Sequence, residues 1–163
     1  MFATENFIPG AVSLEAIKET IFSLEQEAFG DKAFTEKEMT ADFTNKNTVV
    51  VLLKEKETDK IIGFMYARPI EEVEPERIAE KGETAYLWDI VIKEEYRGRH
   101  LAGSLTAALE DELRKRNYVY MELDARTANN YAANVAKVYK DRIIKSEPHD
   151  SIWGPQVFFR IKL

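Results

Sequence analysis

The stretch that decides the fold is Tyr96-Arg97-Gly98-Arg99-His100-Leu101-Ala102-Gly103-Ser104-Leu105. It follows an apolar run at residues 86–92, which is typical of a strand, and it opens an amphipathic helix predicted to end near Arg116. The start of a helix offers unpaired backbone N–H groups and the positive end of the helix dipole, which together attract anions. Arg97 and Arg99 add guanidinium groups that suit phosphate oxygens, so the stretch predicts a phosphate-binding loop. Two arginines before a helix also occur as plain surface chemistry, and this alternative stays open.

Hydrophobic periodicity around this stretch predicts an alternation of helices and strands. Apolar spacing after Ser13 and up to Gly30 indicates a first helix, and Thr35 with Glu38 fits a capping box for a second helix. Further strands are predicted at residues 48–53, 61–67, 118–125 and 157–163. Because a strand, a helix and a strand follow one another after residue 85, we expect a parallel strand pair within a mixed sheet, with helices on both faces.

The composition is that of an ordinary globular domain and excludes several classes of function. The chain has 163 residues, so residues 1–163 are expected to form one domain. A net charge of −6 argues against a nucleic-acid partner, because such binding depends on a basic surface. With no cysteine and two histidines, neither a cysteine nucleophile nor a multi-histidine metal site is expected. No apolar run approaches the roughly 20 residues of a membrane span, and the first residues lack a basic secretory signal, so we expect a cytoplasmic protein without membrane association.

The loop and the segments after it resemble a known family. Arg97 and Ala102 match the first and last positions of the pattern Arg or Gln, two residues, Gly, one residue, then Gly or Ala. The similarity continues through the strand at residues 118–125 and into Asn130 and a helix that carries Tyr139. On these residues the chain resembles the GNAT superfamily of CoA-dependent N-acetyltransferases.

The resemblance implies a fold, a cosubstrate and a set of binding residues. The implied fold is a GNAT-like single-domain α/β (α+β) fold, with a mixed, mostly antiparallel sheet, a central parallel splayed strand pair and helices on both faces. The implied cosubstrate is acetyl-CoA. The residues implied to bind it are Ile90, Val91 and Ile92 along the pantetheine arm, Arg97, Gly98, Arg99, His100, Leu101, Ala102, Gly103 and Ser104 at the pyrophosphate, Asn130 near the cofactor, and Tyr139 near the sulfur. Asn129 or Asn134 could take the place of Asn130, and each of these asparagines could instead cap a helix.

His100 stands at the position where the family usually has its central glycine. A glycine there lets the backbone approach the pyrophosphate closely, so an imidazole would crowd the cofactor. Ordinary helical dihedrals would instead point the imidazole outward, and a protonated ring would contact a phosphate. Crowding would favour an alternative function, a CoA- or effector-binding module with little or no catalysis.

The implied reaction requires a base and an acid. A lysine-type amine has a pKa of about 10.4 and must lose a proton before it attacks a thioester. Asp89 is the leading base candidate because it interrupts an apolar strand just before the loop, where partial burial would raise its pKa; the alternative is a carboxylate that pairs at a strand end. Glu122 on the next strand is a second base candidate, or part of a solvated face. Tyr139 is the implied general acid for the leaving thiolate, or a core tyrosine.

We therefore expect residues 1–163 to form a single acyl-CoA N-acyltransferase domain. It would transfer an acetyl group from acetyl-CoA to a primary amine by direct attack, without a metal ion. The acceptor is a small-molecule amine or a protein amine, and a homodimer is left open. The run at residues 71–83 contains six glutamates, which predicts a solvated loop or an acidic rim that attracts cationic acceptors.

Overall fold

Seven strands pair into one mixed sheet in the order β1-β2-β3-β4-β5-β7-β6. Their bounds are β1 (Phe2–Phe7), β2 (Val49–Glu55), β3 (Lys60–Pro69), β4 (Thr84–Ile92), β5 (Tyr120–Arg126), β6 (Ile143–Ser151) and β7 (Gly154–Lys162). The β4–β5 pair is parallel and is in register at three positions, from Thr84 opposite Tyr120 to Tyr86 opposite Glu122. The β1–β2, β2–β3, β5–β7 and β6–β7 pairs are antiparallel. The structure thus confirms the mixed, mostly antiparallel sheet with one parallel pair.

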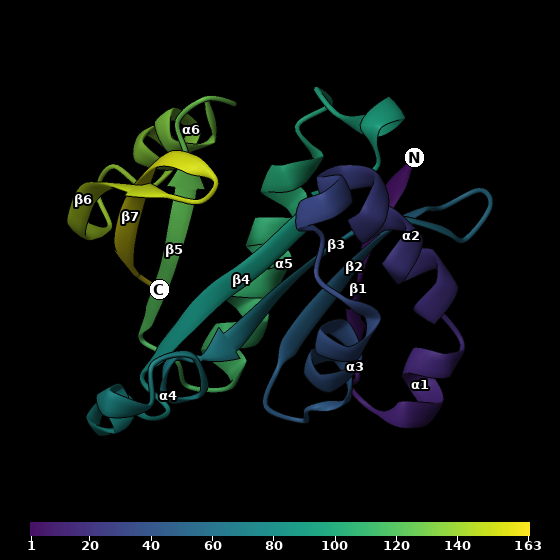
Figure 1. Ribbon diagram of the computed structural model, residues 1–163, viewed down its shortest axis with the longest axis horizontal. Helices are drawn as coiled ribbons and strands as arrows, with labels where there is room; N and C mark the ends of the chain where they lie inside the picture. The colour runs from purple at the N-terminus through teal and green to yellow at the C-terminus, as the bar shows by residue number, and fades with distance from the viewer. The chain divides into compact units, whose positions relative to one another are not determined.

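The computed structural model describes residues 1–163, and the chain packs as two compact units (Figure 1). Unit 1 consists of residues 1–68 and 88–112, and unit 2 consists of residues 69–87 and 113–163. None of the helices is long and apolar enough to span a membrane.

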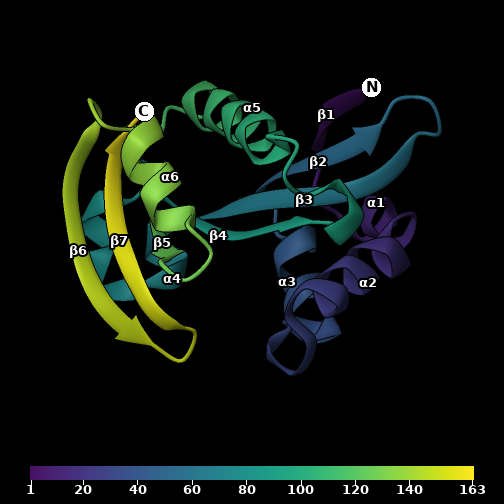
Figure 2. The same cartoon turned by 90° about the horizontal axis from the view of Figure 1, so that it is seen from above.

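Unit 1 has helices on both faces of its strands. Its helical elements are α1 (Ala11–Glu15), α2 (Lys18–Phe29), η1 (Gly30–Lys32), α3 (Glu36–Thr44), η3 (Glu94–Tyr96) and the greater part of α5 (Leu101–Lys115). Figure 2 shows α5 on one face of β2 and β3, and α2 and α3 on the other. Ile21, Met39, Phe43 and Phe64 are fully buried in the core between the strands and α1–α3. Close packing extends to the backbone at Gly63, where a Cβ atom would lie 2.6 Å from the Val91 carbonyl oxygen of β4.

Local sequence signals explain how the helices of unit 1 begin and end. The predicted capping box of α3 is confirmed, because Thr35 Oγ1 accepts from the Glu38 N–H at 3.2 Å and the Glu38 carboxylate accepts from the Thr35 N–H at 2.8 Å. Gly30 ends α2 with a left-handed φ of 55°. The prediction of a single first helix after Ser13 was wrong, because the chain breaks between α1 and α2 and the Ser13 hydroxyl donates to the Ile8 carbonyl at 2.7 Å instead of capping.

Unit 2 also carries helical segments on both faces of its strands. They are α4 (Ile70–Val73), η2 (Pro75–Glu80) and α6 (Tyr131–Val138). Along β5, the fully buried Met121, Leu123 and Ala125 alternate with Glu122 and Asp124. Period-two alternation places these two sets on opposite faces of the sheet.

Candidate functional site

The loop between β4 and α5 makes a left-handed turn before the helix. Gly98 and His100 both have left-handed backbones, with φ of 75° and 60°, and the chain then enters α5 at the buried Leu101. Arg97 Nε donates to the Ile92 carbonyl at 2.8 Å, and Arg99 Nη2 donates to the Glu95 carbonyl at 3.2 Å. These contacts tie both exposed arginines to backbone carbonyls of the segment before the loop, at Ile92 and Glu95.

The backbone of His100 differs from the ordinary helical dihedrals considered for it. Its φ of 60° lies in the left-handed region that favours glycine, which is the residue usual at this position in the family that the chain resembles. Its carbonyl accepts from the Gly103 N–H at 3.2 Å and closes the first turn of α5. The left-handed turn that a glycine would make is therefore present, and the histidine adopts it at an energetic cost.

Two carboxyl groups of unit 1 are buried, that of Asp89 on β4 and that of Glu25 on α2. The exposed fractions are 6% for Asp89 and 1% for Glu25. The Phe34 N–H donates to Glu25 Oε1 at 2.9 Å. Burial raises the pKa of Glu25, and the hydrogen bond from the Phe34 N–H counteracts part of this effect. Sequence reasoning missed Glu25, although its position four residues after Ile21 on the apolar face of a helix was a usable signal.

Aromatic and charged side chains of unit 1 also contact one another. The Phe34 and Trp88 rings stack with centroids 5.9 Å apart, and the Arg68 guanidinium lies 4.6 Å from the Trp88 ring centroid. The Tyr66 hydroxyl donates to Asp42 Oδ2 at 3.1 Å, and Arg68 Nε lies 3.3 Å from Asp42 Oδ1. Burial, followed by the negative charge of Asp89, raises the pKa of Tyr66 well above its ordinary range.

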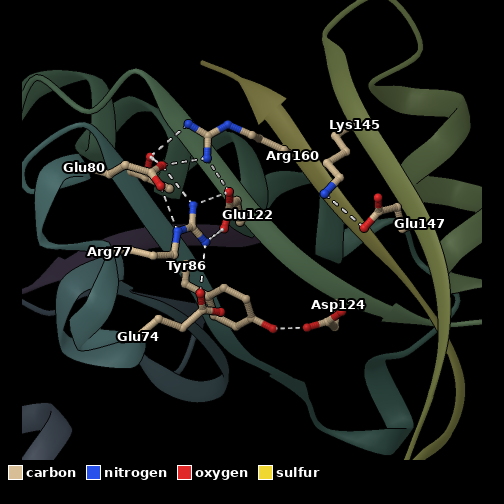
Figure 3. Close-up of polar contacts among 10 residues, drawn as sticks. Glu74, Arg77, Glu80, Tyr86, Glu122, Asp124, Lys145, Glu147 and Arg160 are labelled. Atoms are coloured by element: carbon tan, nitrogen blue, oxygen red, sulfur yellow. Dashed lines mark hydrogen bonds and ion pairs between the residues drawn. The ribbon is translucent and has the colours of Figure 1, made fainter.

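In unit 2, Glu122 is held by two guanidinium groups (Figure 3). Arg77 donates to both of its carboxylate oxygens, at 2.7 and 2.8 Å, and Arg160 donates to Oε1. Both arginines also bind Glu80, and the hydrogen bond from Arg77 is the largest cause that lowers the Glu80 pKa to about 2. Glu122 is only 1% exposed, and both of its carboxylate oxygens accept hydrogen bonds from arginines of the same unit.

Unit 2 contains two further sets of side-chain contacts, one around Asp124 and one at the end of β5. The Tyr86 hydroxyl donates to Asp124 Oδ2, and His149 Nε2 lies 2.5 Å from Asp124 Oδ1. The hydrogen bond to Asp124 is the main cause that raises the pKa of His149. At the end of β5, the Arg126 guanidinium lies 4.5 Å from the Trp153 ring centroid.

Helix α6 carries the remaining predicted site residues. Tyr139 lies at its C-terminal cap, is 4% exposed, and has the Arg142 guanidinium 4.8 Å from its ring centroid. Asn130 precedes the helix with a left-handed φ of 61° and makes no side-chain cap. Asn129 takes the capping role instead, because its Oδ1 accepts from the Tyr131 N–H at 3.1 Å. The exposed side chain of Asn130 is therefore not used by the helix.

The predicted residues thus divide between the two units. Unit 1 contains Asp89, the β4 residues Ile90 to Ile92, and the loop and helix start from Arg97 to Ser104. Unit 2 contains Glu122, Asn130 and Tyr139.

The chain thus combines a mixed sheet that has one parallel strand pair with an arginine-bearing turn that leads from β4 into α5. The chain belongs to the acetyltransferase (GNAT) family, whose model matches residues 14–139. The resemblance noted from the sequence is thereby confirmed. None of the curated proteins is significantly similar to the chain in sequence.

Solved structures of low sequence identity share this fold. The ribosomal-protein-S18-alanine N-acetyltransferase from Escherichia coli is 17% identical with a TM-score of 0.69, over 99% of this chain and 94% of that one. The yncA protein from Salmonella typhimurium, solved with acetyl-CoA, is 13% identical with a TM-score of 0.71, over 100% and 94% of the two chains. The aminoglycoside 6'-N-acetyltransferase from Enterococcus faecium is 13% identical with a TM-score of 0.70, over 98% and 96%. Acetyl-CoA is the cosubstrate of the family.

Proposed function

We propose that residues 1–163 act as one acyl-CoA N-acyltransferase domain that transfers an acetyl group from acetyl-CoA to a primary amine. The observation that carries the proposal is the left-handed turn at Gly98 and His100, which joins two exposed arginines, Arg97 and Arg99, to the start of α5 along the chain of a member of the acetyltransferase family. Backbone N–H groups at a helix start and guanidinium groups together suit a pyrophosphate. Bound acetyl-CoA supplies a thioester carbonyl as the acetyl donor.

Asp89 is the proposed base and Tyr139 the proposed acid. The amine nitrogen attacks the thioester carbon, the C–S bond breaks, and the amine proton passes to the Asp89 carboxylate. The Tyr139 hydroxyl delivers a proton to the departing thiolate. Asp89 is the favoured candidate because it is a carboxylate buried at 6% exposure on the otherwise largely apolar strand β4. Glu122 is the weaker candidate, because its two oxygens accept from Arg77 and Arg160.

The remaining binding roles follow the family pattern. Ile90, Val91 and Ile92 offer the β4 backbone to the pantetheine arm, and Asn130 offers an exposed amide. The acceptor is a small-molecule amine or a protein amine, since the named relatives include enzymes for a ribosomal-protein alanine and for aminoglycosides. Carboxylates of the acidic run are partly neutralised within unit 2, since Glu74 and Glu80 pair with Arg77. This pairing favours a structural role over the acidic rim.

The proposed function is tested by thioester turnover with a panel of amines, together with CoA binding measured by calorimetry. We expect CoA binding and acetylation of at least one amine class. Tight CoA binding with no turnover would favour the alternative function, a CoA- or effector-binding module with little or no catalysis. In that case the imidazole of His100, which stands where the family usually has a glycine, would be the first residue to examine.

The base assignment is tested by comparing Asp89→Asn with Glu122→Gln. We expect Asp89→Asn to lower turnover most at neutral pH and to recover partly at high pH, where more free amine exists. An equal loss between roughly pH 7 and 10 would indicate a structural role for Asp89. A pH-dependent loss in Glu122→Gln would move the base to β5.

A further inference from the structure

A groove of about 960 Å³ lies on the surface of unit 1 and is lined by α1, α2 and α3. The side chains of α2 that line it recur at helical spacing: Lys18, Glu19, Phe22, Ser23 and Gln26. The residues of the same helix that are buried in the core, Ile21 and Leu24, do not line the groove. The groove is therefore bounded by the face of α2 that points away from the core.

The lining of this groove carries an excess of negative charge. Its charged side chains are four carboxylates and one amine: Glu15, Glu19, Asp31, Glu36 and Lys18. Lys18 Nζ lies 2.9 Å from Glu15 Oε1, so the single amine neutralises one of the four carboxylates. The other three, Glu19, Asp31 and Glu36, are exposed. Because like charges repel, the groove disfavours phosphate groups and attracts cations.

Apolar side chains form the rest of the groove and continue beyond it. Phe22 and Phe34 line it and are half-buried against the core. A second hollow of about 510 Å³ shares the α1 side of the groove and contains Val12, which is 89% exposed. Ile8 is 80% exposed, and its carbonyl accepts from the Ser13 hydroxyl of α1 at 2.7 Å. Aliphatic side chains that are exposed next to a groove indicate a contact surface for another molecule.

The combination of charges and apolar side chains determines the kind of partner that fits. A polyamine would pair with the carboxylates but would leave Val12 and Ile8 in water. An amphipathic helix with lysines or arginines beside its apolar stripe meets both requirements. Its apolar stripe would cover the aliphatic and phenylalanine side chains, and its long cationic side chains would reach the exposed carboxylates.

We propose that the groove between α1, α2 and α3 is a docking site for a basic amphipathic helix of a partner protein. The inference goes beyond the proposed function, because docking in this groove involves neither acetyl-CoA nor the loop between β4 and α5.

The proposal is tested by calorimetry of the whole chain with a synthetic peptide of leucines and lysines arranged as an amphipathic helix. The wild type should bind this peptide, with an affinity that falls as salt rises. A variant with Glu19→Gln, Asp31→Asn and Glu36→Gln should bind about tenfold more weakly, the combined effect of three exposed charge pairs. Val12→Ser keeps these charges and should also weaken binding by about tenfold, since it removes a buried aliphatic contact.

The matched control carries Glu76→Gln, Glu83→Gln and Asp141→Asn. These substitutions remove the same charges from exposed positions of unit 2 and should leave the affinity for the peptide unchanged. A peptide with glutamates in place of the lysines should not bind the wild type. Thermal unfolding of each variant checks that the chain remains folded.

Several results would overturn the docking site. The first is an absence of peptide binding by the wild type at low salt, and the second is an equal loss of affinity in the groove variant and the unit 2 control. Binding of spermine as tight as that of the peptide would assign the groove to a small cation, and binding to phosphatidylserine vesicles would assign it to a membrane. A dimer in sedimentation experiments that Val12→Ser abolishes would assign this face to a second copy of the chain. None of these measurements needs turnover, so an inactive wild type would overturn the proposed function alone.

Discussion

At the scale of the residue, loss of the Tyr139 hydroxyl should lower the rate of acetyl transfer directly. Tyr139→Phe keeps the ring against Arg142 and removes only the proton donor. We expect kcat to fall by about 10²–10⁴, the usual size of general-acid catalysis, while CoA affinity measured by calorimetry stays unchanged. Tyr131→Phe on the same helix is the matched control and should keep near-normal turnover. Near-normal turnover in Tyr139→Phe would leave Tyr139 as a packing residue.

The left-handed backbone of His100 has a measurable consequence for stability. A non-glycine residue in this region costs roughly 1–2 kcal/mol, whereas glycine loses about 0.5–1 kcal/mol through its greater freedom in the unfolded chain. We therefore expect His100→Gly to raise the free energy of unfolding by up to about 1 kcal/mol, measured by urea denaturation. Asn117→Gly, with a φ of 66°, is the control and should gain less because asparagine tolerates this region better. A destabilised His100→Gly would show that the imidazole makes a favourable contact.

At the scale of the element, the turn into α5 should bind CoA through charge. Arg97→Ala and Arg99→Ala should each weaken CoA binding by about 1.5–3 kcal/mol, the typical loss of a charge-assisted contact, and the affinity should fall as salt rises. Arg114→Ala, in the last turn of α5, changes the charge equally at the other end of the same helix and serves as the control. Unchanged CoA affinity in both loop variants would contradict the pyrophosphate assignment.

The elements that were predicted from the sequence are those whose signals are local. The capping box at Thr35 and Glu38, the stop at Gly30 and the strand-turn-helix around Arg97 each depend on neighbouring residues, and the structure contains all three. Strands β1 and β6 were missed because edge strands bury little: β6 is exposed at most positions and contains Pro148, which a central strand would exclude.

The chemistry of the site was less predictable because its partners are distant in sequence. Asp89 stood out as a carboxylate in an apolar strand, whereas the Phe34 N–H that binds the buried Glu25 lies nine residues away and beyond the end of α2. Glu122 looked like a base candidate in the sequence, since nothing there shows that Arg77 and Arg160 bind it.

At the scale of the whole molecule, the pair of His149 and Asp124 connects β6 to β5 across β7. Because the His149 pKa is raised above 6.5, the pair stabilises the fold fully below that value and loses its effect as the pH rises through the raised pKa. We expect His149→Gln to lower the free energy of unfolding by less than about 1 kcal/mol at roughly pH 6, and by nothing at roughly pH 9. Urea denaturation at several pH values measures this, with Glu147→Gln as a control that should keep the pH dependence. A deficit that is the same at every pH would contradict the ion pair.

Each unit contains one tryptophan, whose fluorescence can be used to follow the unfolding of that unit. Trp88 belongs to unit 1 and Trp153 to unit 2, and each indole ring lies beneath a guanidinium, at 4.6 Å and 4.5 Å respectively. Indole fluorescence responds to a nearby charge and to water, so the emission of each ring reports the integrity of its own unit. Trp153→Phe leaves a probe of unit 1 and Trp88→Phe leaves a probe of unit 2. Coincident denaturation curves from these two proteins would identify a single cooperative transition, and separated curves would give each unit a stability of its own.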